Sequence, residues 1–318
     1  MKQKLLSLLI LVMFASLGAA QDGTALSGPV SGFVFDQGAH ALRPVLGMPG
    51  ASYLGAPVLD GLEAAGVSPD GSAALAVKEG ALLLVAGLRS AEASAAALEG
   101  AIGGADRFAW APNGTSAAVY ASGAGLVQVL RDLSTAPRAE EPIDVSALPG
   151  AVTALAFSGD ALVVAAANES EGGIYLVASG APPRLLASAA RADAIALSGR
   201  DLFFADRERG QVWEVRDFAG DAVPLLFAEG LHAPVGVQLG ARRLYVANAG
   251  DNTLEVFDLE ARAPAGRIAL DTAPMSLAGF GSRSLWLLNP AGPAGEPLYV
   301  LDAGENPAVY FVPAGRVE

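Results

Sequence analysis

The sequence predicts an all-β fold, a seven-bladed β-propeller in which each blade is a sheet of four antiparallel strands. Short runs of Val, Leu, Ile, Phe and Tyr recur along the chain, separated by clusters of Gly, Asn, Asp and Pro, as is typical of strands and tight turns. A glycine-bearing turn recurs at intervals of 43, 45, 40, 41 and 41 residues. Four strands in a period of about 42 residues are typical of propeller blades. The glycines of this turn are Gly71, Gly114, Gly159, Gly199, Gly240 and Gly281.

The unit at residues 234–270 shows the repeat most clearly. A sheet as short as this one cannot bury both of its faces alone, so it must stack against similar sheets. The four strands of the unit, called A to D below, are predicted at Val235–Gln238, Leu244–Ala247, Thr253–Phe257 and Gly266–Ala269.

Strand B is the best marker of each unit, because it is a near-continuous apolar run. Such a run indicates a strand that neighbouring blades cover on both faces. We therefore expect the strand B aromatics Phe204, Tyr245 and Trp286 to be buried between blades. The alanine-rich stretch Ser90–Gly104 is compatible with a helix, but its position in the repeat favours strand D and the link that follows.

The number of blades depends on how residues 21–60 are interpreted. Six units are readable in full, and residues 21–60 have the length of one more. Seven blades is therefore the prediction, with six blades plus an N-terminal appendage as the alternative. Gly32–Phe35 resembles strand C and Leu42–Leu46 resembles strand D, with Tyr53–Val58 a weaker third strand. Because an open ring would leave unpaired strand edges, we expect Gly32–Leu46 to dock beside the last unit, which ends at Pro307–Gly315.

Residues 1–20 have the layout of a secretory signal peptide. Lys2 and Lys4 precede the apolar run Leu5–Leu17, and small residues lead to Ala20. We expect cleavage after Ala20, which leaves one domain at residues 21–318 in a secreted or periplasmic protein. An uncleaved N-terminal anchor is the alternative. No other stretch is apolar for long enough to cross a membrane.

Charge and cysteine content exclude several functions. Cleavage removes two lysines and no acid, so the formal charge falls from −13 to −15. An acidic surface repels nucleic acid and anionic lipid, and we expect neither as a partner. The chain has no cysteine, which excludes thiol catalysis and thiolate metal sites. We expect a monomer.

Three stretches resemble known propeller repeats. Leu244–Asp258, LYVANAGDNTLEVFD, resembles the YVTN type of surface-layer proteins, and Leu202–Asp217, LFFADRERGQVWEVRD, resembles the NHL type. The turn SPDG at Ser68–Gly71 is similar to that of TolB-like repeats. The Gly-His and Trp-Asp marks of WD40 repeats are missing. These resemblances imply a propeller without choosing an activity, because each repeat type occurs in proteins of unrelated function.

Motifs for catalysis are scarce. The two histidines, His40 and His232, lie far apart in the sequence and give little material for a triad or a histidine metal site. Both read as loop residues, with a general base at the mouth of the central channel as the alternative for His232. Nucleophile-elbow, phosphate-loop and zinc-helix motifs do not occur, so an enzyme is not favoured.

Polar side chains gather in the loops between strands B and C. Successive hairpins of an up-and-down blade point to opposite ends, so the B–C loops and the D–A links share one face, called the B–C face below. The glycine-bearing A–B turns lie on the opposite face. Because rigid strands that present variable loops commonly form binding sites, we expect ligand contacts on the B–C face. The candidate residues are Asn168, Glu169, Asp206, Arg207, His232, Asn248, Asp251 and Asn289.

Three interpretations of these loops stay open. In the first, Asn and Asp satisfy their own turns. In the second, the face binds a protein, peptide or glycan without a cofactor. In the third, the hard oxygen ligands of the B–C loops hold a calcium-type cation near the channel, by analogy with propeller lactonases. Pyrroloquinoline-quinone enzymes fit poorly, because the chain has three Trp and two His. We expect a binding or scaffold module, with a metal-dependent lactonase-like hydrolase as the alternative. That alternative uses Asn168, Glu169, Asp206, Asn248 and Asn289.

Overall fold

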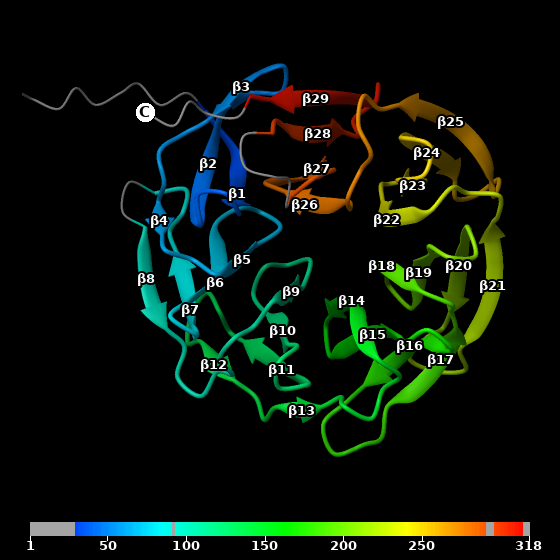
Figure 1. The fold of residues 1–318 in the computed structure, drawn as a ribbon, viewed down its shortest axis with the longest axis horizontal. Coiled ribbons are helices and arrows are strands. Elements are labelled where there is room, and N and C mark those ends of the chain that lie inside the picture. Colours follow the sequence, from blue (N-terminus) through cyan, green and yellow to red (C-terminus); the bar gives the residue numbers. More distant parts are fainter. Residues whose placement is uncertain (1–28, 91–92, 291–295, 314–318) are drawn as a thin grey trace, which may run out of the picture.

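The computed structural model describes residues 29–90, 93–290 and 296–313. The predicted signal peptide and its cleavage site lie outside these residues. Seven antiparallel sheets stand in a ring around a central axis (Figure 1), which is a seven-bladed β-propeller. In the part of the chain that the structure describes, no helix has the length and apolar character needed to span a membrane.

The blades are numbered 1 to 7 along the chain. Blade 1 contains β1 (Val30–Asp36), β2 (Ala41–Met48), β3 (Ala51–Leu54) and β4 (Leu59–Asp60). Blade 2 contains β5 (Ala64–Val67), β6 (Ala73–Lys78), β7 (Ala81–Ala86) and β8 (Ser94–Ala97). Blade 3 contains β9 (Arg107–Trp110), β10 (Ala117–Ala121), β11 (Leu126–Arg131), β12 (Arg138–Ala139) and β13 (Ile143–Asp144).

The remaining blades have four strands each, in sequence order from the axis outwards. Blade 4 contains β14 (Ala151–Ser158), β15 (Ala161–Ala167), β16 (Gly172–Val177) and β17 (Arg184–Ser188). Blade 5 contains β18 (Ala192–Ser198), β19 (Asp201–Asp206), β20 (Gln211–Arg216) and β21 (Val223–Ala228). Blade 6 contains β22 (Pro234–Leu239), β23 (Arg243–Asn248), β24 (Thr253–Asp258) and β25 (Ala263–Ala269). Blade 7 contains β26 (Ala278–Phe280), β27 (Ser282–Leu287), β28 (Leu298–Asp302) and β29 (Ala308–Val312).

The strand predictions for the repeat units are confirmed. The predicted strands A to D of residues 234–270 fall within β22 to β25. Ser94–Ala97 is a strand, as its position in the repeat predicted. Left-handed backbone makes glycine necessary in five of the six A–B turns, and Gly240 is the exception. The five left-handed glycines have φ angles of 69°, 71°, 60°, 59° and 62° at Gly71, Gly114, Gly159, Gly199 and Gly281.

The hydrophobic core is divided among the interfaces between blades. The described residues form seven apolar clusters, one for each pair of adjacent blades around the ring. Strand B contributes buried side chains to these clusters in each full blade. Its aromatics Phe204, Tyr245 and Trp286 are 0%, 1% and 4% exposed. The expected burial of these aromatics is therefore confirmed, and the Tyr245 hydroxyl lies 3.5 Å from the Ala303 carbonyl.

The two ends of the chain meet to close the ring. Val34 and Val45 of blade 1 share an apolar cluster with Phe280, Val300 and Val312 of blade 7. This is the docking predicted from the sequence for Gly32–Leu46. The seven-bladed count is confirmed over the alternative of six blades with an appendage.

The strand assignment within blade 1 was wrong. Gly32–Phe35 and Leu42–Leu46 were predicted as strands C and D, but they lie in β1 and β2, the first two strands of their sheet. Both β3 and β4 pair with β2 on its outer side, so blade 1 has three strand positions. Gly32–Phe35 resembles strand C of the unit at residues 234–270, Thr253–Phe257, in its pattern of side chains. Such a pattern does not specify the position of a strand in a blade.

The direction of β1 explains this difference. Leu62, at the start of blade 2, donates a backbone hydrogen bond of 2.8 Å to His40, which follows β1. At the other end of β1, the A–B turn of blade 7 packs at Gly281 against Ser31. These contacts place the end of β1 on the B–C face, so it runs in the direction of a strand B. Blade 1 therefore begins in mid-repeat and lacks a strand A.

Candidate functional site

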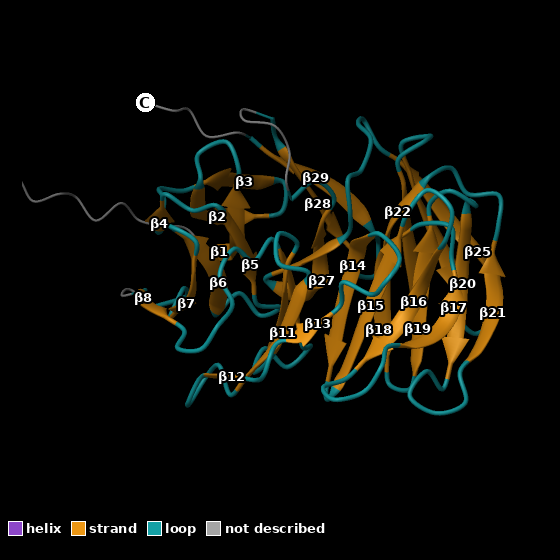
Figure 2. Ribbon diagram, turned by 60° about the horizontal axis from the view of Figure 1, so that its bottom comes forward, coloured by secondary structure: helices purple, strands orange, loops and turns teal. Residues whose placement is uncertain are grey.

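The two ends of the ring differ in construction. Figure 2 shows the sheets standing side by side with loops at both ends. On the A–B side, a Cβ built on Gly71 of blade 2 would lie 3.5 Å from the Cα of Gly281 in blade 7. The two turns meet because blade 1 has no A–B turn between them. The B–C face instead receives the longer polar loops that contain the predicted site residues.

Asp206 is a structural carboxylate of the B–C face. Its side chain is completely buried, and it accepts backbone hydrogen bonds of 2.8 Å from Ala190, 3.2 Å from Arg191 and 3.2 Å from Arg209. The Arg209 guanidinium lies 3.4 Å from the same carboxylate. These contacts join the loop after β19 to the link that enters blade 5. The geometry favours the turn-chemistry interpretation for this residue.

Arg207 belongs to a neighbouring ion-pair network in blade 5. Its Nη1 lies 3.2 Å from Asp193 Oδ2, and the Nε of Arg191 lies 2.9 Å from Asp193 Oδ1. The Asp193 side chain is 14% exposed, whereas the two arginine side chains are 44% and 47% exposed. The pairing fixes both guanidiniums at the surface of the B–C face.

Asn168 and Glu169 occupy the loop after β15. Asn168 Oδ1 accepts hydrogen bonds of 2.8 Å from Ser170 N and 2.9 Å from Glu171 N, which is turn chemistry. Glu169 is exposed, and no contact within the described residues engages its carboxylate. Burial and the Glu171 carboxylate raise the pKa of Tyr175 on the next strand.

Asn248 and Asp251 are joined through one hydroxyl. The amide of the buried Asn248 donates to Thr253 Oγ1 at 3.3 Å, and that hydroxyl donates to Asp251 Oδ1 at 2.7 Å. Asn248 Oδ1 has no hydrogen-bond partner among the described residues. Both side chains therefore organise the loop of their own blade.

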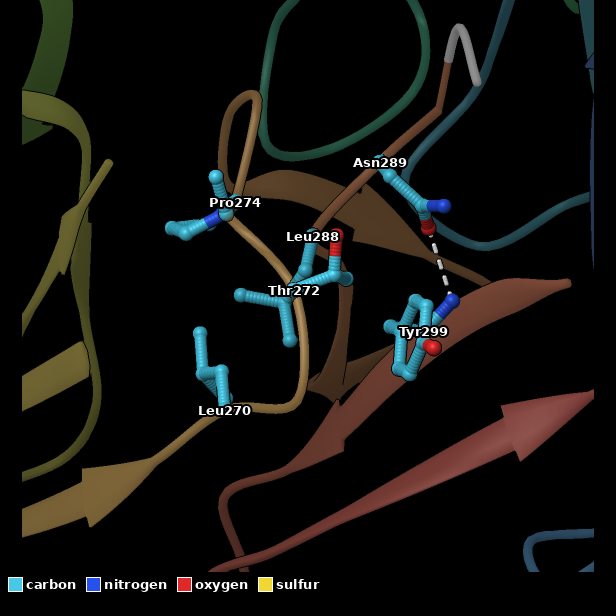
Figure 3. Close-up of a pocket in the computed structure, with 7 residues that line it drawn as sticks. Leu270, Thr272, Pro274, Leu288, Asn289 and Tyr299 are labelled. Carbon is cyan, nitrogen blue, oxygen red and sulfur yellow. Dashed lines mark hydrogen bonds between the residues drawn. The ribbon is translucent and has the colours of Figure 1, made fainter. Parts of the chain in front are cut away.

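Asn289 fixes the end of β27 to the start of β28. Its Oδ1 accepts a hydrogen bond of 2.7 Å from Tyr299 N, shown in Figure 3, and its Nδ2 donates to Pro297 O at 2.9 Å. It also lines a small pocket with Leu270, Thr272 and Leu288 (Figure 3). This pocket has a cavity volume of about 10 Å³, far below the usual size of a ligand site.

The histidines lie in loops, as predicted. His232 is exposed, and its backbone carbonyl accepts a hydrogen bond of 2.9 Å from Gly250 N. His40 is exposed on the same face, and its Nδ1 lies 3.1 Å from the Leu62 carbonyl. Neither ring contacts a carboxylate or hydroxyl side chain among the described residues.

The predicted residues remain in separate blades. No hydrogen bond or ion pair within the described chain joins the predicted side chains of one blade to those of another. The described residues also contain no group of three or more His, Cys, Asp or Glu arranged to hold a metal ion. No observation therefore favours the lactonase-like alternative.

A larger hollow opens on the B–C face between blades 3 and 4. Its cavity volume is about 340 Å³, at the lower end of the range typical of small-molecule sites. Its lining joins the start of β9, the end of β10 and the start of β14. The residues are Asp106, Arg107, Tyr120, Ser122, Ala151 and Val152.

The polar side chains of this hollow are arranged by strand pairing. Tyr120 on β10 lies directly opposite Arg107 on β9, so their side chains project from the same face of the sheet. Tyr120 is 6% exposed and packs among the apolar residues between the two blades. The Ser122 hydroxyl donates a hydrogen bond to Asp106 Oδ2. The hollow thus combines a cation, an anion and two hydroxyls over a partly apolar floor.

Sequence reasoning missed this site because its loop carries no charge. The loop after β10 is Ser-Gly-Ala-Gly at residues 122–125, and a Cβ on Gly123 would meet nothing within 4 Å. The polar groups of the hollow come from the strand ends and from Ser122 at the start of this loop. The adjacent pair Asp106-Arg107 before an inner strand was the available signal. The predicted Asn168 lies nearby, with its Cβ 2.7 Å from a Cβ built on Gly150, which precedes Ala151.

Comparisons with known proteins support the fold. No protein-family model matches the sequence, and no curated protein matches it significantly. Hydrazine synthase of Kuenenia stuttgartiensis has a similar structure, with a TM-score of 0.57 and 12% identity, covering 92% of this chain and 99% of that one. A chain of the nidogen/laminin complex gives 0.52 and 12%, covering 74% and 92%. Hsv2 of Kluyveromyces lactis gives 0.52 and 11%, covering 77% and 75%. At such identities these likenesses show a β-propeller fold alone.

Proposed function

We propose that this protein is an exported propeller that acts as a binding or scaffold module, with its ligand on the B–C face. The observation that carries the proposal is the hollow between blades 3 and 4, because it has the volume of a ligand site and polar groups that converge on it. The small pocket beside Asn289 has less than half of that volume.

The asymmetry of the ring supports the same face. Turns on the A–B side are tight, and those of blades 2 and 7 pack against each other at Gly71 and Gly281. Loops on the B–C face carry side chains whose positions are fixed by hydrogen bonds and ion pairs, as in the Asp206 and Asp193 networks. At the hollow itself, the hydrogen bond from Ser122 fixes the Asp106 carboxylate, which limits the ordering cost of binding.

The class of partner follows from charge and location. The leader at residues 1–20 supports export, and the acidic surface disfavours nucleic acid. A peptide, protein or glycan outside the cytoplasm is therefore the proposed ligand, bound by a monomer without a cofactor. Size-exclusion chromatography with light scattering tests the monomer, and mass spectrometry of the exported protein tests cleavage after Ala20.

Binding can be tested on glycan and peptide arrays with the fluorescently labelled mature chain. Two alanine-to-tryptophan variants form a matched pair. Ala151→Trp places a large side chain at the rim of the hollow, and Ala241→Trp places one in an A–B turn on the opposite face; both positions are exposed. We expect Ala151→Trp to lose the array signal and Ala241→Trp to keep it. The reverse result, or no specific signal on either array, would contradict the proposal.

A further inference from the structure

The Arg107 guanidinium lines the hollow without a protein partner. Among the described arginines whose side chains are placed, Arg107 and Arg243 make no side-chain hydrogen bond or ion pair. The chain has 33 acidic and 20 basic residues, so a shortage of carboxylates does not explain an unpaired arginine. Arg243 begins β23, at the A–B end of blade 6.

Tyr120 adds a second unused donor. Tyr120 is 6% exposed as a residue and lines the hollow, and no described residue accepts a hydrogen bond from its hydroxyl. The hydroxyl is therefore free to donate to a ligand in the hollow. Because Tyr120 stands opposite Arg107 on the paired strand, the phenol and the guanidinium reach the same part of the hollow. Together they offer donors to one anionic group.

Asp106, the residue before Arg107, adds an acceptor to the hollow. Asp106 receives the Ser122 hydroxyl at Oδ2, which leaves Oδ1 free for a donor on a ligand. The hydrogen bond from Ser122 also fixes the carboxylate in place. A cation and an anion side by side select a ligand that carries both an acceptor and a donor group.

We infer that the hollow between blades 3 and 4 binds a carboxylate that carries a neighbouring hydroxyl or amino group. Arg107 and Tyr120 hold the carboxylate, Asp106 accepts the hydroxyl or amine, and Ala151 and Val152 contact the carbon skeleton. Arginine is suited to this role because its planar guanidinium binds a carboxylate through two parallel hydrogen bonds. This inference rests on the proposed function, since it names the ligand class of the same site.

The same chemistry is found in hydroxy acids, uronic sugars and the termini of peptides. Isothermal titration of the mature chain can compare lactate with lactamide, glucuronate with glucose, and a free amino acid with its amide. We expect binding of at least one acid and at least tenfold weaker binding of its uncharged analogue. The acid that binds identifies the source of the carboxylate.

Two pairs of variants test the named residues. Arg107→Gln should weaken binding of that acid at least tenfold, whereas Arg243→Gln, the same change at an unpaired arginine on the opposite face, should leave it unchanged. Tyr120→Phe keeps the packed ring and removes the hydroxyl, so it should weaken binding several-fold with little change in melting temperature. Circular dichroism confirms that each variant is folded.

Three outcomes would overturn the inference. One is equal affinity for the acids and their uncharged analogues, and another is equal effects of Arg107→Gln and Arg243→Gln. The third is no binding of any acid in the series. If an uncharged array ligand is lost with Ala151→Trp and kept with Arg107→Gln, the carboxylate inference fails and the proposed function stands. If no ligand of either kind binds, both fail.

Discussion

Arg89 of blade 2 donates a hydrogen bond of 2.9 Å to the backbone carbonyl of Gly281 in blade 7. The two residues are 192 positions apart in the sequence, and blade 1 separates their blades around the ring. Arg89 lies between β7 and β8, and its Nε also donates to the Asp70 carbonyl in the A–B turn of blade 2 at 2.8 Å. The contact joins the A–B sides of blades 2 and 7, because blade 1 has no A–B turn between them. The contact thus helps to close the ring at blade 1, the blade that begins in mid-repeat.

This closure predicts different costs for two glycine substitutions. Gly281 and Gly159 have φ angles of 62° and 60°, so alanine at either position costs about 1–2 kcal/mol of backbone strain. A Cβ on Gly281 would also clash with Ser31 O, whereas one on Gly159 would meet nothing within 4 Å. We expect Gly281→Ala to lower the free energy of unfolding by a further ~1–3 kcal/mol. Urea unfolding measures the free energy of unfolding of both variants. Equal losses for Gly281→Ala and Gly159→Ala would show that the close packing of Gly281 against Ser31 does not stabilise the closed ring.

Phe204 anchors the interface between blades 4 and 5. It is completely buried and stacks on Trp213 with ring centroids 6.5 Å apart. Phe204→Ala should lower the free energy of unfolding by about 3–5 kcal/mol, as expected of a large-to-small change in a core. Phe311→Ala removes the same side chain from a position that is 62% exposed, and we expect a small effect in the same urea titration. Similar losses for the two variants would contradict the burial of Phe204.

Glu214 makes stability depend on pH. Burial acts to raise the pKa of Glu214, but hydrogen bonds and charge from Arg262 and Arg216 outweigh it and lower the pKa. A carboxylate with a lowered folded pKa stabilises the fold above its unfolded pKa, about 4.3, and loses that contribution as the pH falls through the folded pKa. We expect Glu214→Gln to be less stable than the wild type at pH 7, with the difference shrinking below about pH 4.

The control for this pH dependence is the exposed pair of Arg242 and Glu260, whose side chains are 74% and 80% exposed. Exposed pairs of this kind contribute about 0–1 kcal/mol, so Glu260→Gln should change stability little at either pH. Chemical unfolding at pH 7 and pH 3.5 measures both variants. A Glu214→Gln deficit of the same size at the two values would exclude the proposed electrostatic origin.

Asp206 should affect stability more than binding. Alanine at this position removes the acceptor of three backbone N–H groups and leaves a buried space. The expected loss is about 1–3 kcal/mol or more in the free energy of unfolding. Glu208→Ala in the same loop changes an exposed carboxylate and should cost little. If Asp206→Ala instead keeps full stability and loses the array signal, the carboxylate is a ligand contact and the structural role is wrong.

The fold was largely predictable because short segments of the sequence indicate each strand and turn of the repeat. Left-handed glycines such as Gly71 and apolar strands such as Leu244–Ala247 specify turns and buried strands without long-range information. The position of Gly32–Phe35 was not predictable in the same way. An apolar strand reads alike in any position of a blade, and its direction was set by contacts with Gly281 and Leu62, which lie elsewhere in the chain.

The candidate site was less predictable than the fold. Charged loops suggested Asp206 and Asn289, but their oxygens accept hydrogen bonds from their own blades. The hollow depends on the small side chain of Ala151 and on the pairing of Arg107 with Tyr120. The space forms where three separate segments of the chain meet, and a motif within any one segment cannot predict it.

Hydrogen–deuterium exchange of the mature chain tests the central claim, that a ligand occupies the B–C face at the hollow between blades 3 and 4. The probe is the array ligand, or the acid that binds in the titration series, compared with the free protein. We predict slower exchange in peptides that cover residues 105–109, 119–125 and 149–153. Protection confined to the A–B turns at residues 111–116 and 240–243, with none in the hollow, would contradict the account.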